Sequence, residues 1–480
     1  MPRITDEPTD FPRVLIVAEQ AGVRFGGESI LPYHWFRLLR ARGVPAWMVV
    51  HERSRDELAE LLPAEDFARI RFVPDTATQK WLWRVGGRLP ERMRTYLVSP
   101  ASVFVTQRAA REVVRRVVAE QGIRVVHEPI PVSPRQPSMM ADVGAPVVIG
   151  PMNGAMDYPP AFRGREDALT QLTVGLGRAA GELANRLIPG KRRAAALLVA
   201  NPRTAAALPA GAAGRVIQLP ENGVDLSLWR AGPRRVRRRG EPARFGFVGR
   251  LVDWKAVDLL IEAFARMSGV DAPGGRAAQL EIVGSGPERP RLEELAARLG
   301  AADRVTFAGW RDQAGCRDLM AGWDALVLPS LLECGGAVVL EALAVGLPVI
   351  ATRWGGPADY LDDTCGILVE PAGREGFVAG LASAMARLAA DPELAARLGG
   401  GGPARAAAFD WQAKVDRMLE IYRRAADDGG RPSRAHAVAR RPAAPSVTTS
   451  PGDAAARSAR NPALSRGEII TQRSAPPSLR

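Results

Sequence analysis

Short, continuous apolar runs recur along the first half of the chain, and segments of helix length separate them. A run that is apolar at every position is typical of a strand buried on both faces, as in a parallel sheet. The alternation of such runs with helices predicts a doubly wound α/β domain. The runs are 13–18, 46–50, 125–126, 147–149, 197–199 and 216–217.

A second series of apolar runs follows the basic stretch 234–239, which we interpret as the edge of a linker. This series predicts a second doubly wound domain, with a cleft where the carboxyl ends of the two sets of strands face each other. Its runs are 245–248, 280–283, 305–307, 325–328 and 349–350.

The end of the chain changes character twice. Val415, Met418, Leu419 and Tyr422 form one apolar stripe, which predicts an amphipathic helix. From residue 426 on, Pro, Ala, Ser and Arg dominate, which is typical of a disordered tail. The predicted parts are a first domain over 1–225, a second over 226–410, a helix over 411–425 and a tail over 426–480.

The charge distribution argues against a nucleic-acid partner. The formal net charge is +13, and the segment 431–480 carries nine Arg against Asp453 and Glu468, so more than half of the excess lies in the tail. A nucleic-acid-binding domain concentrates basic charge in a folded patch instead.

Targeting signals are not visible in the sequence. Cys316, Cys334 and Cys365 are odd in number and widely spaced, so they predict neither a disulfide framework nor a zinc site. The first residues lack the basic and apolar regions of a secretory signal, and no apolar run is long enough to span a bilayer. We expect a cytoplasmic protein.

The stretch 329–356 holds two carboxylates at a notable spacing. Glu333 lies in a glycine-bearing loop, and Glu341 follows eight positions later on a short helix. Positions eight apart return to nearly the same face of a helix, so both carboxylates can line one cleft. The alternative is a glutamate that only caps the helix.

Two cations follow the first strand of the second domain. Arg250 ends that strand and Lys255 opens the next helix. A diphosphate needs fixed cations and backbone donors, and a helix N-terminus that follows a strand supplies both. The alternative for Arg250 is an ordinary surface ion pair.

The 329–356 stretch resembles the signature of the retaining glycosyltransferases of family four, which have the GT-B fold. Cys334 and Gly335 depart from the family pattern, which has Gly and Phe there. The matching residues are Pro329, Ser330, Glu333, Gly336, Glu341, Ala342, Ala344, Gly346, Pro348, Val349, Gly355 and Gly356.

This resemblance implies roles for the residues of the donor site. Arg250 and Lys255 hold the donor diphosphate, although Ala256 replaces the usual Gly. Glu341 binds the nucleotide ribose, Glu333 contacts the donor sugar, and Gly336 belongs to the same site. A divalent metal is not expected, because no Asp-x-Asp pair follows a strand, and no cofactor is expected either.

The resemblance implies further contacts from the first domain and a returning helix. His127, in the sequence His-Glu-Pro, reaches the donor sugar, although a single His at a strand end is more often structural. The loop with Gly26 and Gly27 approaches the diphosphate and the acceptor. The helix 411–425 braces the first domain.

The expected function is transfer of a hexose from a nucleoside-diphosphate (NDP) sugar to a saccharide or lipid-linked acceptor, with retention of configuration. The alternatives are a GT-B epimerase or phosphorylase, and a non-catalytic adapter that binds membrane or nucleic acid. An aromatic and basic stretch could make peripheral contact with an anionic membrane, and the equal alternative is that this stretch is a solvated helix. The stretch is made of Trp81, Trp83, Arg84, Arg88, Arg92 and Arg94.

Overall fold

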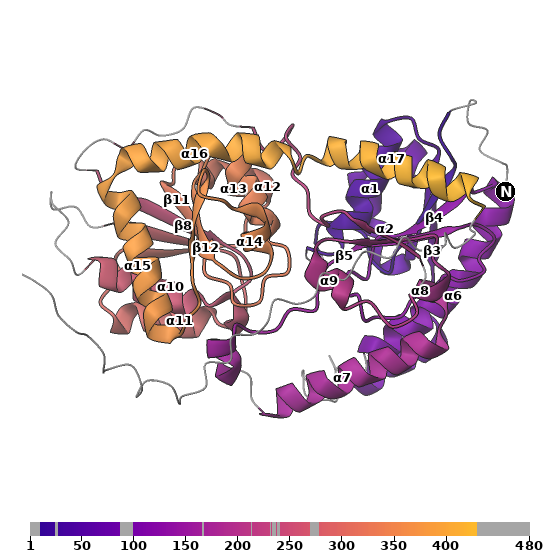
Figure 1. Cartoon of the computed structure of the whole chain (residues 1–480), viewed down its shortest axis with the longest axis horizontal. Coiled ribbons are helices and arrows are strands. Elements are labelled where there is room, and N and C mark those ends of the chain that lie inside the picture. Colours follow the sequence, from indigo (N-terminus) through magenta and orange to yellow (C-terminus); the bar gives the residue numbers. More distant parts are fainter. Residues whose placement is uncertain are drawn as a thin grey trace, which may run out of the picture. The chain divides into compact units, whose positions relative to one another are not determined.

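The structure is a computed structural model, and it describes residues 10–24, 27–86, 99–165, 168–212, 214–230, 232, 237, 241–268 and 278–429. Two separate sheets carry helices between their successive strands (Figure 1). The predicted α/β class, with two doubly wound sheets, is confirmed.

The first sheet has seven strands in the order β3-β2-β1-β4-β5-β6-β7. All its neighbouring pairs are parallel, and the strand order reverses between β1 and β4, where such sheets bind ligands. The strands are β1 (Val14–Val17), β2 (Ala46–His51), β3 (Ile70–Val73), β4 (Val125–Glu128), β5 (Val147–Met152), β6 (Ala196–Val199) and β7 (Arg215–Gln218).

The second sheet has six parallel strands in the order β10-β9-β8-β11-β12-β13. Its order reverses between β8 and β11. The strands are β8 (Arg244–Val248), β9 (Gln279–Val283), β10 (Val305–Gly309), β11 (Ala325–Leu328), β12 (Val349–Thr352) and β13 (Gly366–Val369).

Helices connect these strands in both halves of the chain. The first half has α1 (Ile30–Ala41), η1 (Glu52–Ser54), α2 (Arg55–Leu61), α3 (Ala64–Phe67), α4 (Ala77–Gly86), α6 (Ser99–Gln121), η3 (Pro160–Arg165), α7 (Ala168–Leu187), α8 (Gly190–Arg193) and α9 (Pro202–Ala206). The second half has η4 (Asp253–Lys255), α10 (Val257–Ser268), α11 (Arg289–Arg298), α12 (Gln313–Met320), α13 (Ala337–Ala344), α14 (Gly356–Tyr360), α15 (Arg374–Ala390), α16 (Pro392–Ala407) and α17 (Trp411–Asp427).

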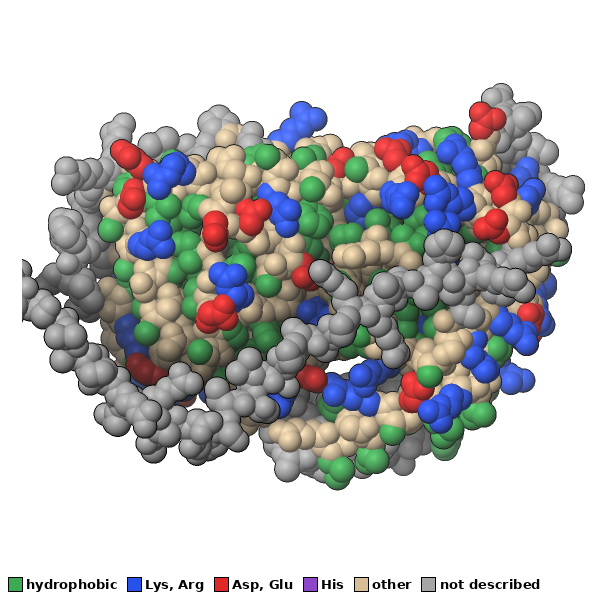
Figure 2. Space-filling model, viewed as in Figure 1, with side chains coloured by type: hydrophobic (Ala, Val, Ile, Leu, Met, Phe, Trp, Pro, Cys, Tyr) green, Lys and Arg blue, Asp and Glu red, His purple; other side chains and the backbone are tan. Residues whose placement is uncertain are grey.

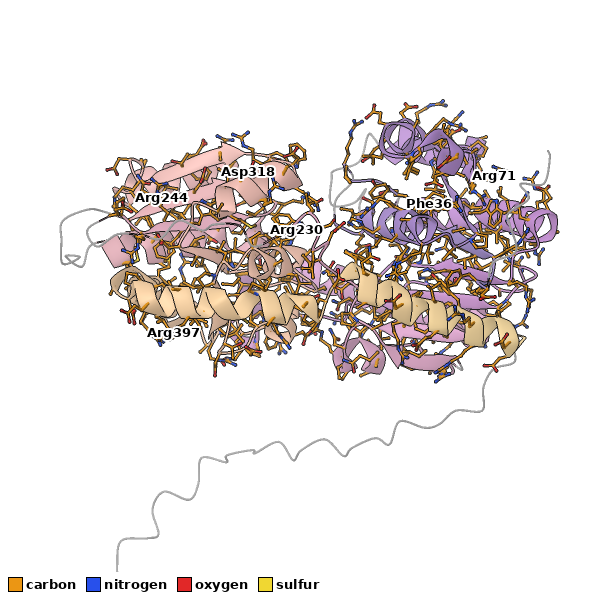
Figure 3. The ribbon with its side chains drawn as sticks, turned by 90° about the horizontal axis from the view of Figure 1, so that it is seen from above. Phe36, Arg71, Arg230, Arg244, Asp318 and Arg397 are labelled. Carbon is orange, nitrogen blue, oxygen red and sulfur yellow. The ribbon has the colours of Figure 1, made fainter. Side chains whose placement is uncertain are left out.

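The strand β1 shows why the apolar runs are continuous. Val14 and Ile16 belong to one hydrophobic cluster, and Leu15 and Val17 belong to another on the opposite face of the sheet. Successive side chains of a strand point to opposite faces, so helices on both faces require an apolar residue at every position. Phe36 of α1, labelled in Figure 3, lies in the first of these clusters.

The helix α17 follows the second sheet in the sequence but packs in the core of the first. Trp411, Met418 and Tyr422 are buried in the cluster that contains Val14 and Trp35. The apolar stripe of this helix is therefore a packing face.

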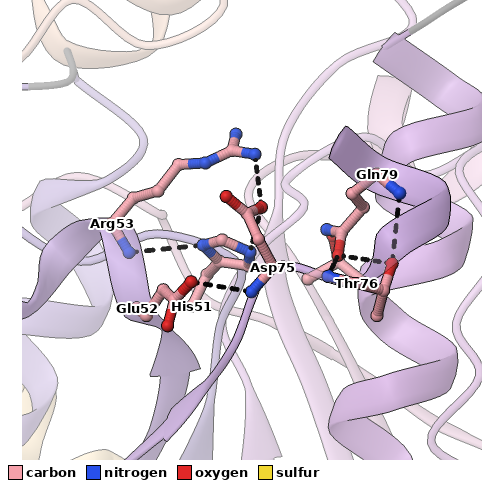
Figure 4. A network of polar contacts seen from close by, with 7 residues as sticks. His51, Glu52, Arg53, Asp75, Thr76 and Gln79 are labelled. Atoms are coloured by element: carbon pink, nitrogen blue, oxygen red, sulfur yellow. Dashed lines mark hydrogen bonds and ion pairs between the residues drawn. The ribbon is translucent and has the colours of Figure 1, made fainter. Parts of the chain in front are cut away.

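A polar network ties the end of β2 to the segment that follows β3 (Figure 4). Asp75 accepts from Arg53 at 2.7 Å and lies 3.2 Å from Nε2 of His51. Gln79 of α4 then contacts Thr106 of α6. These contacts fix the carboxyl edge of β2.

Some sequence predictions fall on residues that the structure does not describe. Gly26 lies outside the described residues, and so do Arg88, Arg92 and Arg94, most of the stretch 234–239 and the tail from residue 430 on. The edge strands β3 and β13 were not predicted from the sequence.

The described surface is mixed in charge. On the face drawn in Figure 2, basic and acidic side chains of the described residues lie interspersed. Among the described helices, none combines the length and the apolar character that crossing a membrane requires.

Candidate functional site

The loop between β11 and α13 carries the first predicted carboxylate. Gly336 caps α13 with a φ of +84°, in the left-handed region that favours glycine. A Cβ there would lie 3.2 Å from Cγ of Glu333. Gly336 therefore turns the chain so that the Glu333 side chain fits beside it.

Glu333 forms an ion pair with Lys255. The two side chains are only 12% and 18% exposed, so water screens the pair weakly. Lys255 ends η4, directly after β8, and the Leu331 amide donates to the Trp254 carbonyl at 2.9 Å. The structure thus joins the predicted sugar carboxylate to a predicted diphosphate cation.

Arg250 follows β8 and is exposed. It makes no ion pair with any residue that the structure describes, so the alternative of a surface ion pair gains no support. Its loop rests on the turn after β9. A Cβ on Gly284 would lie 1.9 Å from the Gly249 carbonyl oxygen, and one on Gly286 would lie 2.2 Å from that of Leu251. The glycines of this turn therefore serve close backbone packing that supports Arg250.

Glu341 lies on α13 and lines a cavity of about 330 Å³. Burial raises the pKa of its carboxyl to about 7, although a hydrogen bond with Gln313 opposes the rise. The cavity is also lined from the first half of the chain by α1, and by the crossover segment after β7. Its polar lining residues include Tyr33, Arg37, Asn222, Asp225 and Gln313.

A larger cavity, of about 460 Å³, contains none of the predicted residues. It lies at the amino ends of β8, β9 and β10 and is lined by Arg244 and Asp318, both labelled in Figure 3. Ligands of open α/β sheets bind at the carboxyl ends of the strands. The smaller cavity at Glu341 is therefore the better candidate for a substrate site.

The position of His127 does not support the expected contact with a donor sugar. The ring is fully buried on β4, where its Nε2 donates to the Gly150 carbonyl at 2.6 Å and its Nδ1 accepts from the Tyr422 hydroxyl at 2.7 Å. Burial lowers the pKa of His127 to about 4, so the ring is neutral at neutral pH. Because both ring nitrogens have partners and the ring is buried, His127 anchors α17 in this structure.

The loop after β1 is only partly described. Gly27 is exposed, and a Cβ would meet nothing within 4 Å, so no close contact requires glycine there in this structure. The Glu57 carboxylate holds the preceding residues by accepting from the backbone amides of Val23 and Arg24. Glu57 belongs to α2, and no local motif in the sequence marks it.

Known proteins resemble both the sequence and the fold. Residues 242–391 match the model of the family described as Glycosyl transferases group 1. That segment contains Arg250, Lys255, Glu333 and Glu341. The D-inositol 3-phosphate glycosyltransferase of Saccharomonospora viridis is 36% identical over 226 residues, which are 45% of this chain and 51% of that protein. The chain thus spans about half the length of the curated relatives it matches.

Solved structures extend the likeness to both halves of the chain. Sucrose-phosphate synthase from Thermosynechococcus elongatus has a TM-score of 0.61 at 22% identity, over 86% of this chain and 98% of that one. Anabaena HepE in complex with UDP has a TM-score of 0.56 at 18% identity, over 86% and 100%. These neighbours and the two doubly wound sheets identify the GT-B fold.

Proposed function

We propose that the chain is a glycosyltransferase that moves a hexose from an NDP-sugar to a saccharide or lipid-linked acceptor, in polysaccharide or glycoconjugate biosynthesis. We further propose the retaining mechanism of family four. The observation that carries the proposal is the Lys255–Glu333 ion pair at the carboxyl edge of β8 and β11, with the exposed Arg250 in the same segment after β8. The match of residues 242–391 to a glycosyltransferase family supports it.

The proposed chemistry follows from these charges. The sugar leaves the diphosphate as an oxocarbenium-like species, and negative charge builds on the diphosphate. Arg250 and Lys255 stabilise that charge at a site where fixed cations act more strongly than in water. Glu333 accepts hydrogen bonds from sugar hydroxyls beside the anomeric carbon. The acceptor attacks from the face that the diphosphate leaves, and the leaving phosphate takes its proton.

The nucleotide ribose belongs at Glu341 in this proposal. Its carboxyl lines the 330 Å³ cavity and accepts hydrogen bonds from the ribose hydroxyls. UDP is bound in the structure of HepE, which shares the fold, and this suggests UDP-sugars as the first donors to test.

The deciding experiment is a screen of NDP-sugars by thermal shift, followed by transfer assays with and without excess EDTA. We expect one donor to stabilise the protein, and its turnover to survive EDTA because protein cations replace a divalent ion. Release of NDP that depends on added acceptor separates a transferase from an epimerase. Activity that is lost with EDTA and restored by manganese would contradict the metal-free proposal. Absence of any nucleotide binding would favour the adapter.

The ionisation of Glu341 gives a pH prediction. Because its pKa is about 7, the carboxyl changes from mostly protonated at pH 6 to mostly ionised at pH 8. Ribose hydroxyls donate more strongly to the carboxylate, so the ratio of NDP affinities, parent over Glu341→Gln, should rise about tenfold from pH 6 to pH 8. Calorimetric titration of both proteins measures this ratio and cancels the ionisation of NDP itself.

The matched control is Glu128→Gln. Burial also raises the pKa of Glu128 to about 7, but this residue bonds Ser138 within the first half of the chain. Its affinity ratio should stay flat with pH. A flat ratio for Glu341→Gln as well would remove Glu341 from the ribose site.

Membrane contact remains part of the proposal for a lipid-linked acceptor. Trp81 on α4 is 57% exposed, as an interfacial anchor would be. The basic residues that accompany it in the sequence lie largely outside the described ranges. We propose that the protein is cytoplasmic, with peripheral contact at the inner membrane face.

A further inference from the structure

A buried polar cluster joins the loop of Glu333 to the first half of the chain. We call it the Glu221 cluster and define it as Asn153, Glu221, Asn222 and Lys414. Asn153 follows β5, Glu221 and Asn222 follow β7, and Lys414 lies on α17. The roles proposed above use none of these side chains, and only Asn222 also lines the cavity at Glu341.

Asn153 connects the two sheets directly. Its Nδ2 donates to Oε1 of Glu221 and to the carbonyl oxygen of Cys334, both at 2.7 Å. Its Oδ1 accepts from Nδ2 of Asn201 at 3.3 Å. Because both ends of the amide have partners and the residue is 3% exposed, the orientation of Asn153 is fixed.

Glu221 is 5% exposed and holds the centre of the cluster. Its Oε1 also accepts from Nδ2 of Asn222 at 3.0 Å. The Lys414 ammonium donates to the backbone carbonyls of Glu221 and Asn222, at 2.8 and 2.9 Å. Oε2 of Glu221 is buried and has no hydrogen-bond partner among the described residues. Such a group is costly to bury, so a purely structural core would be better served by an apolar residue.

The cluster explains why this chain has Gly335 where the family pattern has Phe. A Cβ on Gly335 would lie 2.0 Å from Nδ2 of Asn222 and 2.2 Å from Oε1 of Glu221. The loop backbone therefore packs directly on the cluster, and any side chain at this position would displace one or the other. Glycine at 335 and the carboxylate at 221 fit each other.

The same loop is held on its other side. The Gly356 amide donates to the Glu333 carbonyl at 2.8 Å. A Cβ on Gly355 would lie 2.4 Å from that carbonyl oxygen. The carbonyl of residue 333 is thus held by the turn after β12, and the carbonyl of Cys334 by Asn153. These two contacts fix the backbone from which the Glu333 side chain extends.

We propose that Asn153 and Glu221 are positioning residues that set the Glu333 loop for sugar transfer. This inference rests on the role proposed above for Glu333. Neither residue touches the proposed substrate sites, so both act through the Cys334 carbonyl and the backbone of Gly335. Their removal should impair the transfer step and leave nucleotide binding, at Arg250 and Glu341, unchanged.

The kinetic test compares Glu221→Ala with Glu221→Gln. Glutamine keeps an oxygen that can accept from Asn153 and Asn222, whereas alanine keeps none. We expect Glu221→Ala to lower kcat by about 10- to 100-fold, as a small misplacement of a reacting group does, with the affinity for UDP or GDP unchanged. Glu221→Gln should restore most of the loss. Ser138→Ala, which removes a different buried hydrogen bond, should keep the parental kcat.

A second measurement does not depend on activity. Cys334 is partly buried, and Cys316 and Cys365 are buried, so three thiols report on the structure. Labelling by 5,5′-dithiobis(2-nitrobenzoate), with each site read by mass spectrometry, measures local opening. We expect Cys334 to react about tenfold faster in Glu221→Ala, the equivalent of one lost hydrogen bond, with the other two thiols unchanged.

The thiol-labelling rates test the positioning role even if no donor sugar is turned over. Failure of the positioning proposal is therefore distinct from failure of the proposed function. If Glu221→Ala does not fold, Asn153→Ser makes the same comparison, because it removes the bond to the Cys334 carbonyl. Parental labelling of Cys334 in a folded variant would overturn the positioning role. Equal acceleration of all three thiols would also overturn it, because it would indicate general loss of stability.

Discussion

Replacing Lys255 by alanine is expected to lower kcat/KM about 100- to 1000-fold, the usual effect of losing a charge contact to a developing anion. The substitution removes one of two proposed cations at the leaving diphosphate. It also leaves the Glu333 carboxylate, which is 12% exposed, without its ion-pair partner. Steady-state kinetics and calorimetric NDP affinity measure the loss. Lys80→Ala is the matched control, because Lys80 is an exposed lysine on α4, a helix of the first half of the chain.

Arg250→Ala distinguishes the ligand contact from the ion pair. Arg250 has no described ion-pair partner, so its removal should weaken NDP binding or turnover by about 10- to 150-fold without affecting the fold. Lys255→Ala should in addition lower the free energy of unfolding by about 1–3 kcal/mol. The double variant Lys255→Ala, Glu333→Gln should regain that stability but not the activity. Parental NDP affinity and kcat/KM in both single variants would exclude a diphosphate site here.

The central strands of the fold could be predicted because burial on two faces leaves a simple mark. β1 and β11 are apolar throughout, as strands covered by helices on both sides must be. The edge strand β3 was missed because Arg71 interrupts its pattern, and an edge strand tolerates a polar, half-buried position. β13 was missed because its four residues are half-buried in the middle and too short to stand out.

The charged part of the site could be predicted from topology. Arg250, Lys255 and Glu333 all follow strands of one parallel sheet, so their placement at its carboxyl edge requires no knowledge of side-chain packing. The contact of His127 with Tyr422 could not be predicted, because Tyr422 lies 295 residues away on α17. Asn153 meets the Cys334 carbonyl across 181 residues, which no local pattern records.

Lysine is rare in this chain, and the positions of its few lysines carry information. The chain has four lysines among 65 basic residues, and the sequence predicted a role only for Lys255. Lys191 and Lys414 are also buried, at 2% and 5% exposure, and both donate to backbone carbonyls. A compact ammonium suits such positions better than a planar guanidinium. Two of the four lysines therefore mark buried sites, whereas Lys80 is exposed.

Alanine at position 256, where the family pattern has glycine, costs conformational free energy although the two side chains differ by only one methyl group. Ala256 has a φ of +52°, in the left-handed region, where a residue with a Cβ loses about 1–2 kcal/mol relative to the right-handed one. The turn directly follows Lys255, so this strained geometry helps to set the ammonium beside Glu333. The sequence could show that glycine was replaced, but not that the backbone kept the conformation of a glycine.

Replacing Glu333 by glutamine is expected to lower the single-turnover rate of transfer about 100- to 1000-fold while leaving NDP affinity nearly intact. The substitution has the same shape, so the loop held by Asn153 and Gly356 should keep its backbone. It removes the charge that we assign to the sugar hydroxyls. Only contacts that are stronger in the transition state than in the ground state change the rate of the chemical step. Rapid-quench transfer assays and calorimetry, run on the same preparations, separate the two effects.

The paired variant Glu341→Gln should show the opposite pattern, with weaker binding of both NDP and NDP-sugar and a smaller change in rate. The two glutamates lie on one loop and helix, so a general disturbance of that segment would affect both quantities in both variants. The two roles are therefore supported only if one variant mainly lowers the rate and the other mainly weakens binding, because general damage would not give opposite patterns. Transfer by Glu333→Gln at the parental rate would end the assignment of Glu333 to the sugar. NDP binding by Glu341→Gln as tight as that of the parent would end the assignment of Glu341 to the ribose.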